Sequence, residues 1–138
     1  MKHSLPVFLL ALSLVVVAGC GNQGGNPDAL LEKAISDRPI TVMTIRDGMV
    51  ERFSLTMHVT VRAQDAGAFD KEYESFSRQI NESIAIIMRD ATPEERMEVE
   101  FTTIKERAKE RINEILGTPW VQEVIITGVT FEVQELQV

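Results

Sequence analysis

The strict alternation of apolar and polar side chains over residues 52–62 is the feature that most constrains the fold. A period of two places successive side chains on opposite faces of a β-strand, so one face of this strand must be covered. Residues 40–45 are also β-rich, and Asp47-Gly48 predicts a tight hairpin turn between the two segments. The predicted apolar face carries Phe53, Leu55, Met57, Val59 and Val61, and the polar face carries Arg52, Ser54, Thr56, His58, Thr60 and Arg62.

Two amphipathic helices are predicted to supply that cover. In the first, apolar positions recur at steps of three and four over about six turns, and the helix should end near Asp90. Residues 92–95 (Thr-Pro-Glu-Glu) then predict a capping box and a proline at the first position of a second helix. This helix is expected to bend near Glu100 and to end before Gly117. The predicted apolar stripes are Phe69, Tyr73, Phe76, Ile80, Ile84 and Ile87, and then Phe101, Ile104, Ala108, Ile112 and Ile115.

The remaining segments complete an α+β fold. Residues 121–134 are β-rich again, and Gly128 within them is expected to mark a bulge or a close backbone approach. Near the other end, Asn26-Pro27-Asp28 predicts an N-cap and the start of a short helix that ends before Pro39. The predicted fold is a small antiparallel sheet, formed by the hairpin and the C-terminal strand, packed against two long amphipathic helices.

The beginning of the chain predicts export and a lipid anchor. Lys2 precedes an apolar run from Leu5 to Ala18, which fits a secretory signal peptide and is short for a membrane span. The run closes on Val17-Ala18-Gly19-Cys20, which resembles the lipobox of bacterial lipoproteins. That resemblance implies cleavage before Cys20 and lipid attachment to its sulfur. The alternative is an ordinary signal peptide that is cut nearby and leaves a free cysteine.

The expected organisation is therefore a lipoprotein signal peptide over residues 1–19, an anchoring segment over 20–38, and an α+β domain over 39–138. The anchoring segment combines the lipidated Cys20, a glycine-rich flexible tether and the short helix. Cleavage leaves 13 basic residues against 21 acidic ones, a net charge of −8. This balance argues against nucleic acid and against electrostatic attachment to anionic lipid, so the membrane contact is assigned to the acyl chains on Cys20.

The residues that could carry chemistry are few. After cleavage the chain keeps one histidine, His58, which is expected to be a solvated or hydrogen-bonded strand residue; a pH-sensitive contact is the alternative. An acidic cluster could be considered a hard-cation site, but the helix dipole already explains acids in a first turn. Trp120 is expected to pack on the core, with an exposed anchor as the alternative. We expect no catalytic residues, no metal and no cofactor. The acidic cluster is Glu94, Glu95, Glu98 and Glu100, and the mixed helix face that follows carries Lys105, Arg107, Lys109 and Arg111 among glutamates.

The order of these segments resembles the periplasmic domain of the flagellar basal-body-associated FliL family. The resemblance covers about residues 40–136 and is carried by four segments. They are Val59-Thr60-Val61 at the end of the alternating strand, residues 78–88 (RQINESIAIIM), residues 104–117 (IKERAKERINEILG) and residues 124–134 (VIITGVTFEVQ). It implies a stomatin-like fold and a non-catalytic role beside the flagellar stator, where family members assemble into rings. Members of that family usually carry an amino-terminal transmembrane helix, whereas this chain has the lipobox.

Two functions are therefore considered. The first is a periplasmic lipoprotein that supports or regulates the flagellar motor through contacts with the stator and with copies of itself. The second is an envelope lipoprotein that serves another membrane complex or captures a peptide on an exposed strand edge. The inner membrane, with the lipid in its outer leaflet, is favoured. Gly21 after the cysteine leaves the outer membrane open.

Overall fold

The computed structural model describes residues 25–137, so the predicted signal peptide and Cys20 lie outside the described residues. The sheet is antiparallel and is built around one long central strand, β3. On one side β4 pairs with β3 along its length; on the other, β2 pairs with residues 49–55 and β1 with residues 58–62 of β3. The elements are β1 (Leu30–Ala34), β2 (Ile40–Arg46), β3 (Met49–Arg62), a 3-10 turn (Ala63–Asp65), α1 (Ala66–Asp90), α2 (Pro93–Arg96), α3 (Thr102–Leu116) and β4 (Val121–Glu135).

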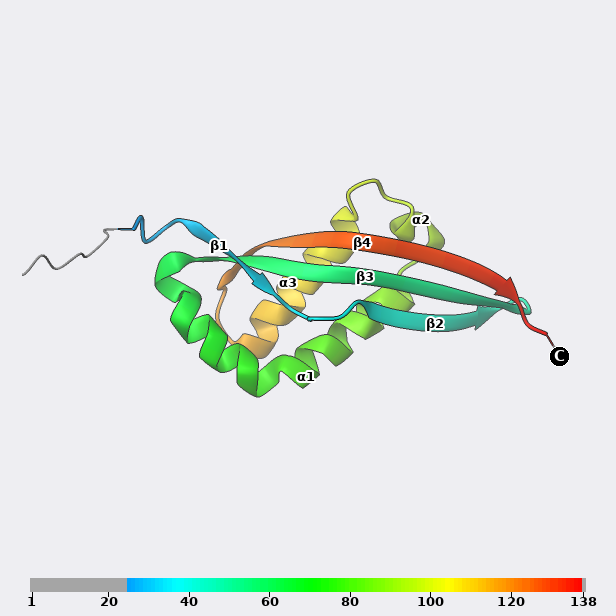
Figure 1. Cartoon of the computed structure of the whole chain (residues 1–138), viewed down its shortest axis with the longest axis horizontal. Coiled ribbons are helices and arrows are strands. Elements are labelled where there is room, and N and C mark those ends of the chain that lie inside the picture. Colours follow the sequence, from blue (N-terminus) through cyan, green and yellow to red (C-terminus); the bar gives the residue numbers. More distant parts are fainter. Residues whose placement is uncertain (1–24, 138) are drawn as a thin grey trace, which may run out of the picture.

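The predicted α+β architecture is confirmed. Figure 1 shows the long strands running along the longest axis of the molecule, with α1 and α3 packed together on one side of the sheet. The strands extend past the helices at the end where β2 turns into β3 and where β4 finishes. One end of the sheet therefore lacks the helical cover that the rest receives.

The core lies between the predicted apolar face of β3 and the stripes of the two helices. The five predicted apolar side chains of β3 are each at most 1% exposed. Ile80 and Ile84 of α1 pack against them together with Ile104 and Ile112 of α3, all fully buried. On the opposite face Ser54 is also covered, because its hydroxyl lies 2.7 Å from that of Thr41 in β2. The remaining members of the two predicted stripes are buried or half-buried.

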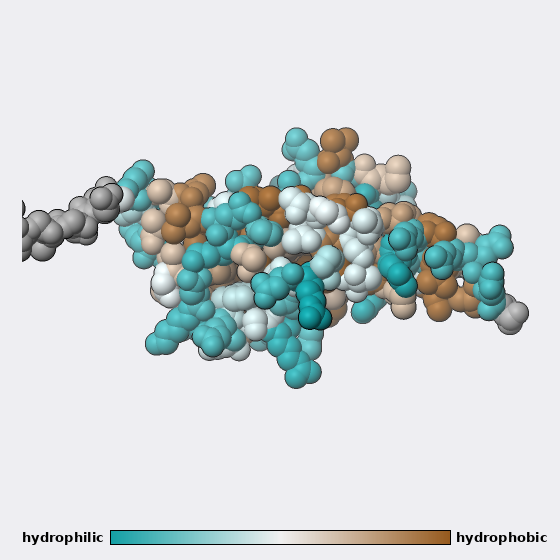
Figure 2. All heavy atoms as spheres, in the orientation of Figure 1, coloured by the Kyte–Doolittle hydropathy of each residue, from teal (hydrophilic) through white to brown (hydrophobic). Residues whose placement is uncertain are grey.

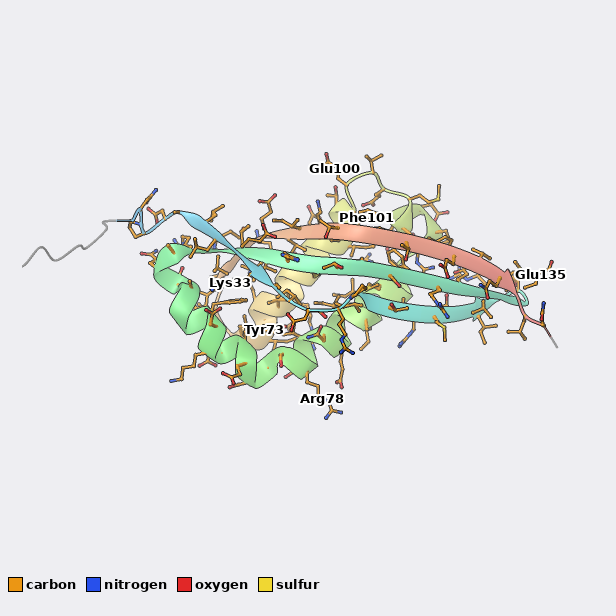
Figure 3. All side chains as sticks on the ribbon, viewed as in Figure 1. Lys33, Tyr73, Arg78, Glu100, Phe101 and Glu135 are labelled. Atoms are coloured by element: carbon orange, nitrogen blue, oxygen red, sulfur yellow. The ribbon has the colours of Figure 1, made fainter. Side chains whose placement is uncertain are left out.

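The prediction of a short helix before Pro39 is wrong, because residues 30–34 form strand β1. Helix propensity is a weak preference, and here a stretch of β3 beyond the end of β2 offers free backbone groups to pair with. The side chain of Ile35 is buried directly after β1, and its carbonyl oxygen accepts a hydrogen bond from the Tyr73 hydroxyl of α1. Figure 3 shows Tyr73 on α1 beneath the end of this strand. The sheet therefore begins within residues 20–38, at the place where the sequence predicts the short helix of the anchoring segment.

The second predicted helix is interrupted rather than bent. Its start is confirmed, because Thr92 and Glu95 form the reciprocal capping box. The helix then stops after Arg96, and α3 begins at Thr102 after Phe101, which has a left-handed backbone (φ 55°). Glu98 fixes this break, since its carboxylate accepts hydrogen bonds from the backbone N–H and the hydroxyl of Thr103 at 2.9 Å and 2.7 Å. We call residues 97–101 the corner loop.

Glycines act at the predicted turning points. Asp47 and Gly48 both have positive φ, as the tight hairpin turn requires. Gly128 has φ +60° and lies in a bulge, because the register moves from Ser54–Thr130 to Thr56–Thr127 and so leaves one extra residue on β4. The bulge prediction is confirmed. It separates the half of β4 that packs on α3 from residues 129–135, which run to the uncovered end.

Candidate functional site

The residues singled out from the sequence are scattered over the described fold. His58 lies on the outer face of the sheet with its Nδ1 2.6 Å from Oε1 of Glu32 in β1, so it is a hydrogen-bonded strand residue. Trp120 is half-buried against the core, as expected. Cys20 lies outside the described residues. Within residues 25–137, His58 on the outer face and Trp120 on the core side do not form a common site.

Two members of the acidic cluster, Glu95 and Glu98, take part in separate local contacts. Glu95 completes the capping box and also pairs with Arg107 of α3 at 2.9 Å. Hydrogen bonds from the backbone and then from the side chain of Thr103 lower the pKa of the Glu98 carboxyl. Within residues 25–137 no three histidine, cysteine, aspartate or glutamate side chains converge on a common metal position. The described helices also include none that is long and apolar enough to cross a membrane.

A pocket of about 140 Å³ lies between the sheet and α2. It opens where α1 has ended and the helical cover gives way to the short α2 and the corner loop. Two strands and one helix provide its walls, which are mainly apolar and aromatic. The lining residues are Glu51 and Phe53 of β3, Val129 and Phe131 of β4, Pro93 and Arg96 of α2, and Met97 of the corner loop.

Arg96 holds the sheet and α2 together inside this pocket. Its side chain is only 5% exposed, and Nη1 lies 3.0 Å from Oε2 of Glu51. Nη2 donates to the carbonyl oxygens of Met88 and Arg89 at the end of α1, 3.3 Å and 3.2 Å away. The guanidinium also lies 5.4 Å from the ring centroid of Phe53. A buried cation is stable only when several partners surround it. The contacts of Arg96 with Glu51, two carbonyl oxygens and Phe53 meet this requirement.

Two groups around Arg96 have unused contact capacity. Its Nε is buried and has no hydrogen-bond partner among residues 25–137. The second aromatic ring beside the guanidinium, that of Phe131, lies 6.0 Å away but leaves half of its own surface in solvent. A buried donor gains free energy from an acceptor, so an oxygen atom placed beside Arg96 Nε would be favoured.

Several exposed apolar side chains lie on the corner loop and on β4, the two segments that meet at the opening. Met97 is 81% exposed and Val99 is 95% exposed on the corner loop, and Phe131 and Val133 follow on β4. Figure 1 shows the connection between α2 and α3 above β4 at the top of the view. Figure 2, in the same orientation, shows apolar atoms at this place. Isolated exposed apolar residues are ordinary on protein surfaces, but this group adjoins an apolar pocket. We call Met97, Phe131 and Val133 the apolar rim.

The outer edge of β4 borders the same opening. No other described strand pairs with this edge, since β4 pairs with β3 alone. The N–H of Leu136 donates to the carbonyl oxygen of Gly48 at 2.9 Å, which places residue 136 in a hydrogen-bonded position toward β3. Hydrogen-bonded positions alternate along an antiparallel pair, so the backbone groups of Phe131, Val133 and Glu135 point away from β3. Phe131 and Val133 therefore combine backbone groups that point away from β3 with side chains on the pocket side.

Sequence reasoning missed this site. Arg96 and Glu51 are 45 residues apart, and nothing in the sequence pattern indicates that they meet. The available signal was weak: Phe131 and Val133 extend the alternating pattern of β4 beyond the length that the predicted helices can cover. No protein-family model and no curated protein sequence matches the chain.

Proposed function

We propose that the protein is a non-catalytic lipoprotein, anchored through acyl chains on Cys20 and facing the periplasm, which acts through contacts with other proteins. The partner that the FliL resemblance suggests is the stator of the flagellar motor. The single observation that supports a contact role most strongly is the pocket around Arg96 with its apolar rim. It joins an unsatisfied buried donor to exposed aromatic and aliphatic surface.

The placement of this surface suits an anchored protein. The described chain enters the sheet at β1, whose Leu30 pairs with Arg62 at one end of β3. Phe53, in the pocket wall, lies nine residues further back along β3, which corresponds to about 30 Å at the usual strand rise. Figure 1 shows the entry point and the C-terminal end of the sheet at opposite ends of the molecule. A lipid at Cys20 would thus attach the molecule through the end of the sheet that is farther from the pocket.

A second candidate function is supported by the free edge of β4. An envelope lipoprotein can use such an edge to take up an extended segment of another membrane complex, with no connection to the motor. Both candidates require the same anchor and the same surface. They differ in the partner, which cell phenotypes can distinguish.

The test combines membrane separation with motility. Inner and outer membranes are separated from cells that express the native protein or Cys20→Ala, and a deletion strain is scored for swimming with its filaments counted. The proposal predicts native protein in the inner membrane, loss of membrane anchoring in Cys20→Ala, and reduced swimming with filaments present. Normal swimming of the deletion strain would exclude the motor as the site of action. Unchanged anchoring of Cys20→Ala would exclude the lipid on this cysteine.

A further inference from the structure

We propose that residues 129–135 of β4 bind an extended segment of a partner protein, in which apolar or aromatic residues alternate with lysine or arginine. The segment would add a strand to the sheet and place one side chain in the Arg96 pocket. This inference rests on the proposed contact function and names the surface and the chemistry of the partner. It is carried by three properties of the same stretch: free backbone groups, an adjoining pocket and acidic charge.

The backbone supplies the first step. The N–H and C=O groups of Phe131, Val133 and Glu135 point away from β3, as the Leu136–Gly48 hydrogen bond establishes. No described strand pairs with this edge. Residues 130–135 pair with β3 in an uninterrupted register, because the bulge lies before them at Gly128. The edge is thus regular over the stretch that borders the pocket, which is what strand addition needs.

The pocket supplies the second step. A partner residue directly opposite Phe131 would have its side chain on the same face as Phe131, toward the corner loop. Met97 and Phe131 border the opening, and the pocket volume of about 140 Å³ is close to that of protein cavities that hold a benzene ring. An aromatic side chain therefore fits. A tyrosine would also bring an oxygen that can accept the unpaired Nε–H of Arg96.

Charge supplies the third step. Residues 129–135 contain two glutamates, Glu132 and Glu135, and neither lysine nor arginine. Glu132 lies on the outer face, half-exposed, with only a distant contact of 3.8 Å to Arg52. Figure 3 shows Glu135 at the far end of the sheet, beyond the helices. In the partner strand, the residues before and after the one that enters the pocket have their side chains on the outer face of the sheet. They lie near Glu132, whose negative charge favours a cation. A second copy would bring one acidic β4 edge against another.

The binding experiment uses the lipidated full chain in a non-ionic detergent and a short fluorescent peptide with blocked ends. In this peptide lysine alternates with valine, and tyrosine replaces the central valine. We expect saturable binding measured by anisotropy. Alanine in place of the tyrosine should weaken binding about tenfold, as for other buried anchor residues. Glutamate in place of the lysines, or N-methylation of the backbone groups that face β4, should abolish it.

Two pairs of protein variants locate the site. Val133→Pro removes an N–H that points away from β3, so the sheet should fold while strand addition is blocked. Gln134→Pro removes an N–H that faces β3 and should unfold the sheet, which checks the assigned direction of the backbone. Met97→Lys places a cation on the apolar rim and should weaken peptide binding about tenfold. Val99→Lys makes the same charge change outside the pocket lining and should alter binding less than threefold.

The outcomes separate this inference from the proposed function. Binding that Val133→Pro and Met97→Lys leave unchanged would overturn the inferred site, and so would a peptide that does not bind the folded protein. Self-association that is lost in Val133→Pro without any peptide would assign the edge to a second copy and overturn the partner class. A normally swimming deletion strain would refute the motor role alone, because the peptide experiment does not depend on motility.

Discussion

Removing the Arg96 guanidinium is expected to destabilise the protein by about 3 kcal/mol. Arg96→Met keeps an unbranched side chain in the pocket but deletes the ion pair with Glu51 and two hydrogen bonds to the end of α1. The lost hydrogen bonds contribute about 1 kcal/mol each, and an unpaired, mostly buried carboxylate costs about 1–3 kcal/mol. Burial of the methionine offsets about 1 kcal/mol of this loss.

The partner substitution turns this value into a measurement of coupling. Glu51→Gln keeps the shape of the side chain and is expected to cost about 2 kcal/mol, because it leaves the Arg96 charge without its counterion. The double variant should lose about 3 kcal/mol, so the coupling between the two residues is about 2 kcal/mol. The assay is urea unfolding followed by circular dichroism with a constant m-value. Losses that add to within about 0.5 kcal/mol would refute the account of this pair.

Three further predictions test the sheet, the corner and the bulge. Met57→Asp should unfold the domain, whereas His58→Ala on the opposite face should shift the melting temperature by only a few degrees; equal losses would refute the assigned faces. The hydrogen bonds that lower the pKa of Glu98 stabilise the fold above the ordinary glutamate pKa, and this contribution is lost as the pH falls through the lowered value. Glu98→Gln should therefore flatten the acid side of a plot of melting temperature against pH, and an unchanged acid side would contradict this. Gly128→Ala should cost about 1 kcal/mol through its positive φ, whereas Gly67→Ala, which meets no neighbouring atom, should stabilise α1 by up to about 1 kcal/mol; unfolding curves compare the two, and equal effects would contradict the reasoning.

Local patterns predicted most of the fold because they are properties of single segments. The face of β3 follows from a period of two, and both helix stripes follow from steps of three and four. Gly48 and Gly128 mark positions where the backbone has positive φ, which glycine adopts at low cost. These signals do not depend on which segments meet in the folded chain.

The features that could not be predicted depend on pairing between distant segments. Residues 30–34 consist of good helix formers and become β1 because β3 extends beyond the end of β2 and offers backbone groups to pair with. The corner loop is set by the left-handed Phe101 and by the contacts of Glu98, neither of which the helical pattern indicates. The pocket arises only when Arg96 meets Glu51 across the fold, so composition and spacing contain almost no sign of it.

The measurement that tests the central claim most directly is complementation of the deletion strain by four proteins at equal membrane levels. These are the native chain, Val133→Pro, Met97→Lys and the control Val99→Lys, with the amounts checked by immunoblot. The account predicts that the native chain and Val99→Lys restore swimming, while Val133→Pro and Met97→Lys remain anchored but do not. Equal restoration by all four would contradict the claim that the protein acts through the edge of β4 and its pocket.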